Sequence, residues 1–306
     1  MEIRVIGRGA LAGFIAGVLG FVFARIFAEP LIGKAIAYEG GRGEILDKLN
    51  AAVGKATEPE GPEIFSRTIQ SNIGIASAII GFSTAMGALV AVAYLVLHGR
   101  FDIRPRNLAW LLAAGGFFGI YVLPFVKYPA NPPAIGHDFT IATRGRLYLT
   151  MVVVSLVLIG LAAVAVRKLL PRFGLVSSVL IASVGFFVVY GLVIGLLPSL
   201  GNLSANKEHV DQFGFARAAT ETPQPIVNIT GKPLTIDGQT IAPGQLVYPG
   251  FDADLLWKFR WYSLINQLIV WTGIGLVFGG LLERFFGTSR REQASERSVR
   301  QPATAG

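Results

Sequence analysis

The sequence predicts an all-α membrane protein, a bundle of about six transmembrane helices with a small β-rich insertion outside the cytoplasm. Its composition is 52% apolar and only 15% charged, and charge is costly inside a bilayer. Six apolar stretches approach or exceed the ~20 residues that a helix needs to cross a hydrocarbon core about 30 Å thick. None has the polar face of a helix in a soluble protein. The six stretches are residues 11–27, 73–97, 108–125, 147–166, 175–197 and 264–282.

The charge pattern predicts the orientation of these helices. Basic residues gather in the two termini and in two loops, and with six helices these four segments fall on one side, so both termini are expected in the cytoplasm. The basic residues are Arg4 and Arg8; Arg100, Arg104 and Arg106; Arg167, Lys168 and Arg172; and Arg284, Arg290, Arg291, Arg297 and Arg300.

The first apolar stretch has an alternative interpretation as a signal peptide, with Ala35-Ile36-Ala37 as a cleavage site. The stretch is longer than a usual signal core, and the site lies well beyond its end. A retained helix is therefore the favoured interpretation.

Several classes of partner and cofactor are excluded. The net charge of +8 comes mainly from short loops and tails, which face lipid headgroups and do not form a nucleic-acid surface. The chain has no cysteine, which excludes disulfides and thiolate metal sites. It has no phosphate-binding loop for a nucleotide, so any transport is not driven by its own ATP hydrolysis.

The chain is predicted to form a six-helix transmembrane domain over residues 1–284. After Glu29-Pro30 stops the first helix, apolar stripes over residues 31–56 predict two short helices lying on the outer surface. The outer segment 203–250 contains Asp237-Gly238 between short alternating runs, which predicts a hairpin. The polar residues 285–306 are expected to be a disordered cytoplasmic tail.

Gly9, Gly13 and Gly17 leave one stripe of the first helix without side chains. Such a stripe lets two helices approach closely in lipid. Tight packing is the favoured interpretation, and a glycine-lined path is the alternative.

An unusual proline-rich segment follows the third apolar stretch, with four prolines between Pro124 and Pro133. Proline at this density forbids a regular helix, and irregular backbone near a bilayer requires protein or water to satisfy it. The segment is either a re-entrant piece at the mouth of a pathway or a stiff extended connection.

The candidate metal ligands are Glu29, Glu39, His137 and Asp138, which the topology places on the outer side. Imidazole with carboxylate oxygens suits a divalent ion such as cobalt or nickel. The alternative for His137-Asp138 is a solvated pair in a loop. Asn266 and Gln267 are the most polar pair in the last stretch, and we expect them to face the interior of the bundle.

Three segments resemble the CbtA family of predicted cobalt transporters. The segments are Phe27–Pro30 with Ala35–Glu39, Val122–Ala134, and Leu255–Arg260, and the likeness extends from about Arg4 to Arg284. The resemblance implies cobalt transport linked to cobalamin supply in the cytoplasmic membrane of bacteria or archaea. It also implies a small one-span partner, CbtB, that bears histidines.

Some positions of this chain match the family's motifs and others depart from them. Lys127, Tyr128, Asn131 and Arg260 match, together with Glu29 and Glu39. The chain has no histidine in residues 39–63, where many members are histidine-rich, and its outer insertion is longer.

The leading hypothesis is therefore a cobalt transporter with no permanently bound cofactor. The alternative is a scaffold subunit that presents its outer insertion to a small metal-binding partner. A membrane enzyme is not favoured, because no nucleophile and base have suitable spacing.

Overall fold

The computed structural model describes residues 2–54, 66–100, 103–208 and 221–300, with the backbone alone for residues 287–300. The chain is mostly helical and separates into two compact units, each considered by itself below. Among the residues described, five helical stretches are long and apolar enough to cross a membrane: Glu2–Ala52, Arg67–Leu97, Pro105–Lys127, Asp138–Glu208 and Ala253–Phe286. The chain is thus a helical protein of membrane type.

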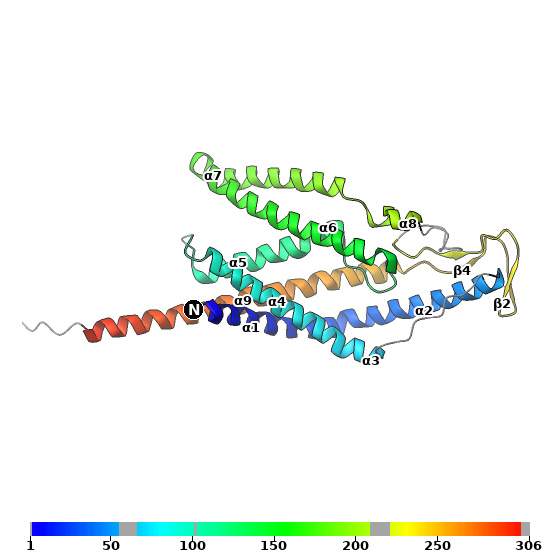
Figure 1. Ribbon diagram of the computed structural model, residues 1–306, viewed down its shortest axis with the longest axis horizontal. Coiled ribbons are helices and arrows are strands. Elements are labelled where there is room, and N and C mark those ends of the chain that lie inside the picture. Colours follow the sequence, from blue (N-terminus) through cyan, green and yellow to red (C-terminus); the bar gives the residue numbers. More distant parts are fainter. Residues whose placement is uncertain (1, 55–65, 101–102, 209–220, 301–306) are drawn as a thin grey trace, which may run out of the picture. The chain divides into compact units, whose positions relative to one another are not determined.

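The first unit comprises residues 2–23, 68–117 and 265 onward. It contains α1 (Glu2–Phe23), α4 (Ile75–Leu97), α5 (Pro105–Gly116) and most of α9 (Ala253–Arg300), as labelled in Figure 1. The short α3 (Arg67–Ile69) and a π-helical turn, Gln70–Gly74, precede α4. Tyr94 of α4 and Phe278 of α9 are fully buried and meet edge to face, with ring centroids 5.7 Å apart. This aromatic pair therefore joins α4 and α9 within the unit.

The glycine stripe of α1 packs directly on α4. A Cβ atom added to Gly13 would lie 2.9 Å from both the Ser83 carbonyl carbon and the Thr84 Cα, and closer still to the Ser83 oxygen. A Cβ on Gly17 would lie 2.9 Å from the Ile80 Cα. The stripe is therefore a contact between two helix backbones, whereas Gly191 and Gly195, also four residues apart, have nothing within 4 Å of the same position.

The second unit comprises residues 24–67 and 118–264. A π-helical turn, Ala24–Ala28, leads into α2 (Glu29–Ala52), and another, Phe117–Val122, leads into α6 (Leu123–Lys127). Two 3₁₀ turns, Asp138–Thr140 and Leu200–Asn202, flank α7 (Ile141–Leu196), and α8 (Ser204–Glu208) follows.

The long helix α7 bends back on itself (Figure 1). Gly174 has φ 70° and ψ 174°, a conformation outside the helical region that glycine adopts without a Cβ penalty. The two arms pack together, because Met151 from one arm and Tyr190 from the other belong to the same buried cluster.

In place of the two short helices predicted for residues 31–56, the structure has the single helix α2, and residues 55–56 lie outside the described residues. Pro30 occupies the first turn of α2, where a helix lacks an intrahelical partner for its N–H groups, so proline does not break it. Leu31 and Ala35 of α2 are buried with Phe251 and Leu255.

The described residues of segment 203–250 contain four short strands. β1 (Ile226–Val227) pairs antiparallel with β4 (Leu246–Tyr248), and β2 (Leu234–Ile236) pairs antiparallel with β3 (Gln239–Ile241). Asp237 and Gly238 form the turn of the second pair, both with positive φ.

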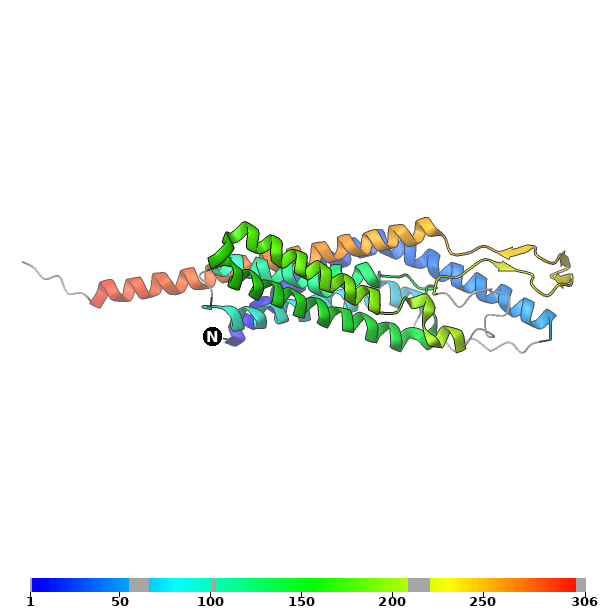
Figure 2. The same cartoon turned by 90° about the horizontal axis from the view of Figure 1, so that it is seen from above.

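The strands lie beside the C-terminal half of α2 (Figures 1 and 2). Leu49 and Ile226 are fully buried in one cluster, and Lys48 Nζ lies 2.7 Å from Asp237 Oδ2. Residues 209–220 of the predicted insertion lie outside the described residues.

The C-terminal segment differs from the sequence-based expectation. Residues 285–306 were expected to be disordered, whereas α9 continues through Arg300. Residues 301–306 lie outside the described part of the chain.

Candidate functional site

The proline-rich segment after α6 is held in place by hydrogen bonds from distant parts of the second unit. Tyr128 is 4% exposed, and its hydroxyl donates to the Pro198 carbonyl at 2.8 Å. The Gly136 N–H donates to the Glu221 carbonyl at 2.7 Å. The Arg144 guanidinium donates to the carbonyls of Ile135 at 3.3 Å and His137 at 3.2 Å. The irregular backbone is therefore satisfied by protein groups, as its position requires.

Gly136 is required for this arrangement. Its φ is 99°, and an added Cβ would meet the Arg144 guanidinium. Only glycine accommodates both the backbone conformation and the close approach.

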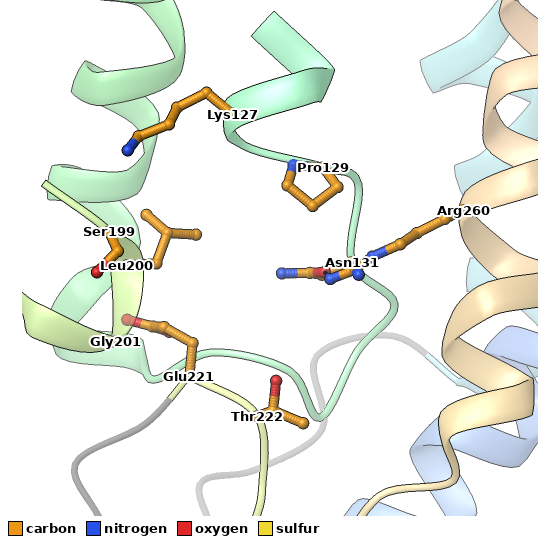
Figure 3. A pocket seen from close by; sticks show the side chains of 9 residues that line it. All are labelled: Lys127, Pro129, Asn131, Ser199, Leu200, Gly201, Glu221, Thr222 and Arg260. Atoms are coloured by element: carbon orange, nitrogen blue, oxygen red, sulfur yellow. Dashed lines mark hydrogen bonds between the residues drawn. The ribbon is translucent and has the colours of Figure 1, made fainter. Parts of the chain in front are cut away.

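A pocket of about 290 Å³ lies beside the proline-rich segment, within the second unit (Figure 3). Its lining comes from the end of α6, the segments on both sides of α8, and the first turns of α9. The lining residues are Lys127, Pro129, Asn131, Ser199, Leu200, Gly201, Glu221, Thr222 and Arg260.

Glu221 is the one acidic residue of this lining, and its charge is compensated. The residue is 6% exposed. Its carboxylate accepts hydrogen bonds from Thr140 Oγ1 and from Asn206 Nδ2, each at 3.3 Å. Arg144 Nε lies 3.8 Å from Glu221 Oε2, which makes an ion pair. A buried carboxylate requires such partners.

Arg260 holds Asn131 in one orientation. Its Nη2 donates to Asn131 Oδ1 at 2.9 Å, and its Nε donates to the Ala130 carbonyl at 3.4 Å. Figure 3 shows Arg260 reaching from α9 toward Asn131, whose amide points into the pocket. Lys127, at the end of α6, lines the same pocket. The structure thus brings together three of the residues singled out from the sequence: Lys127, Asn131 and Arg260.

Glu29 lies at the start of α2 and forms an ion pair with Arg67, through Oε1 and Nη2. The Glu29 side chain is 8% exposed and that of Arg67 is 36% exposed. Glu29 Oε2 is buried and makes no hydrogen bond within the described residues.

Glu39, His137 and Asp138 belong to the same unit, and the two carboxylates influence each other. Their interaction is electrostatic, because the negative charge of Asp138 acts on the Glu39 carboxylate. The His137 ring stacks on Phe139, with centroids 5.0 Å apart. Among the side chains that the structure describes, in residues 2–54, 66–100, 103–208 and 221–286, no three of histidine, aspartate or glutamate form a group that could hold a metal ion.

Asn266 and Gln267 belong to the first unit. Asn266 Oδ1 is buried without a hydrogen-bond partner in the described chain and lies close to Gly20 of α1. Gln267 Oε1 accepts a hydrogen bond from Trp271 Nε1 at 3.2 Å.

Sequence reasoning did not identify Arg144 and Glu221, which organise the proline-rich segment. Their separation of 77 positions leaves no local pattern that would connect them. A usable signal was Arg144 itself, a charge near the start of a long apolar helix, since charge in such a position usually has a partner.

Comparison with known proteins gives one family. A sequence model described as "Probable cobalt transporter subunit (CbtA)" matches residues 2–283, nearly the whole chain. No curated protein and no solved structure matches the chain.

Proposed function

The chain belongs to the CbtA family of probable cobalt transporter subunits, and we propose that it moves cobalt across the cytoplasmic membrane of a bacterium or archaeon without hydrolysing ATP itself. Cobalt is the cargo, and the transport serves cobalamin supply. A small one-span membrane protein of the CbtB type is the proposed partner.

In this proposal the chain crosses the membrane six times. The two arms of α7 on either side of Gly174 each make one crossing, and the other four long helices make one each. Support comes from the bend itself and from the basic residues Arg167, Lys168 and Arg172 beside it, which favour the cytoplasmic side. Both termini then lie in the cytoplasm, and the strands β1 to β4 form an outer insertion.

Glu39 and Asp138 are the proposed first contact for the ion. The observation that supports this assignment is the electrostatic repulsion between the carboxylates of Glu39 and Asp138. A divalent cation placed between two carboxylates relieves their mutual repulsion and stabilises both charged groups. His137, next to Asp138, offers an imidazole nitrogen. Two weak ligands suit a transporter, which has to release its ion.

Glu29 is the proposed second contact, since one oxygen of its buried carboxylate has no hydrogen-bond partner in the described chain. Arg67 compensates its charge when no ion is bound. Lys127, Tyr128, Asn131 and Arg260 have a structural role at the proline-rich segment in this proposal and do not contact the ion. Asn266 and Gln267 supply amide oxygens among the helices of the first unit.

The test is radiolabelled cobalt uptake into proteoliposomes that contain the full chain. The double variant Glu39→Gln/Asp138→Asn should lower uptake about tenfold at limiting cobalt, because each charged contact contributes on the order of 1 kcal/mol or more. Asp47→Asn, a change of the same kind on the same helix, is the control and should take up cobalt normally.

Unchanged uptake by the double variant, in protein shown to be folded and inserted, would remove this site. An absence of uptake by the unmodified chain, alone and together with its one-span partner, would overturn the transport function.

A further inference from the structure

The pocket beside the proline-rich segment has a cationic lining. Lys127 and Arg260 are both half-buried there, and neither forms an ion pair with a carboxylate among the described residues. The carboxylate of Glu221 is compensated by Arg144, Thr140 and Asn206. The pocket therefore has an excess of positive charge.

The uncommitted polar groups of the lining are mainly hydrogen-bond donors. Arg260 uses Nε and Nη2 to hold Ala130 and Asn131, and its Nη1 makes no hydrogen bond within the described chain. Because Asn131 Oδ1 accepts from Arg260, the Nδ2 group of this amide is the end that faces the pocket (Figure 3). The ammonium group of Lys127 adds three more donors.

This chemistry selects the kind of ligand. A divalent cation would be repelled by Lys127 and Arg260, so the pocket does not suit bare cobalt. An oxyanion accepts from several donors at once, and arginine recognises carboxylate and phosphate through its planar fork. A volume of about 290 Å³ is at the small end of ligand pockets, which limits the ligand to one small group.

We propose that the pocket lined by Lys127, Asn131 and Arg260 binds the carboxylate or phosphate group of a small anionic ligand. This inference goes beyond cobalt transport and does not depend on it. The oxyanion comes either from a soluble molecule or from a lipid headgroup at the membrane surface.

The test uses the full chain in nanodiscs of zwitterionic phosphatidylcholine, titrated calorimetrically with citrate and, separately, with inorganic phosphate. Saturable binding of either probe is expected. Arg260→Gln and Lys127→Gln should each weaken it about tenfold or more, the usual effect of losing a charge-assisted hydrogen bond. Arg260→Lys, which keeps the charge, should lose less affinity for the probe than Arg260→Gln does.

Lys34→Gln is the matched control, because Lys34 is an exposed cation of the same unit outside the pocket. This variant should bind citrate or phosphate as tightly as the unmodified chain does. Thermal unfolding of every variant establishes that the protein is folded.

A second arm separates the two sources of the oxyanion. If the natural ligand is a lipid headgroup, phosphatidylglycerol added to the nanodiscs should displace citrate, and native mass spectrometry should find this lipid on the unmodified chain and not on Arg260→Gln. If the ligand is soluble, citrate or phosphate should bind equally with and without phosphatidylglycerol. The proposal is overturned if neither probe nor lipid binds, or if folded Arg260→Gln binds as well as the unmodified chain.

Discussion

The two compact units hold their helices together in different ways. In the first unit, α1 and α4 touch through glycine backbone with no side chain between them. In the second unit, buried carboxylates are paired with arginines, as in Glu29 with Arg67 and Glu221 with Arg144. The closest helix contact of the first unit therefore depends on shape, whereas the second unit adds buried charge pairs to its apolar clusters.

The largest effect is expected from filling the contact between α1 and α4. Gly13→Leu places atoms where the Ser83 and Thr84 backbone lies, and it should destabilise the protein by at least about 3 kcal/mol, as severe overpacking does. Thermal unfolding in detergent, followed by tryptophan fluorescence, measures the change. Gly191→Leu is the control, since nothing lies within 4 Å of a Cβ at Gly191, and equal unfolding temperatures for the two variants would contradict the packing argument.

A smaller effect is expected from breaking the ion pair between Glu29 and Arg67 in the second unit. Arg67→Met leaves the Glu29 carboxylate buried without its partner and should cost about 2 kcal/mol. This is less than the 3–5 kcal/mol of a fully buried pair, because the Arg67 side chain is 36% exposed. Chemical denaturation measures the loss.

The double variant Glu29→Gln/Arg67→Met provides the internal control for this pair. It removes both charges, so it should recover part of the stability lost in Arg67→Met. A double variant that is less stable than Arg67→Met would show that the pair does not act through charge.

The smallest effect is expected from Tyr128→Phe, which removes one hydrogen bond between the proline-rich segment and Pro198. The free energy of unfolding should fall by about 1 kcal/mol, and hydrogen exchange should increase at Gly136 and its neighbours. Val126→Ala is the comparison, because Val126 is 63% exposed and close in sequence. Equal rates of hydrogen exchange at Gly136 in both variants would mean that Tyr128 does not anchor the proline-rich segment.

The features read correctly from the sequence are those determined by nearby residues. Apolar stretches longer than a bilayer is thick identify helices of membrane type, whatever their neighbours are. Pro129, Pro132 and Pro133 exclude a helix over residues 129–136 in the same local way, whereas Pro124, the fourth proline of the segment, lies in the first turn of α6. The close packing favoured for Gly13 also follows from a local repeat, although its partner α4 does not.

The remaining features depend on contacts that no local pattern contains. Glu29 was chosen as an acidic residue in an outer motif, but its partner Arg67 lies 38 positions away. Arg260 and Asn131 meet across 129 positions. The single helix α2 was missed because two separate apolar stripes in residues 31–56 were interpreted as two short helices, whereas the helix is continuous from Glu29 to Ala52.

The bent helix α7 has a consequence for how sequences in this family can diverge. In the most apolar 18-residue window of this helical stretch, only 11% of the residues are buried inside the protein. Most side chains of the window therefore face outward from the protein. Exchanges among leucine, valine, isoleucine and phenylalanine on these positions change neither a contact nor the hydropathy. Apolar exchanges on the exposed positions of α7 are therefore expected to be tolerated, whereas Gly174 is not replaceable in this way, because its positive φ restricts every other residue type.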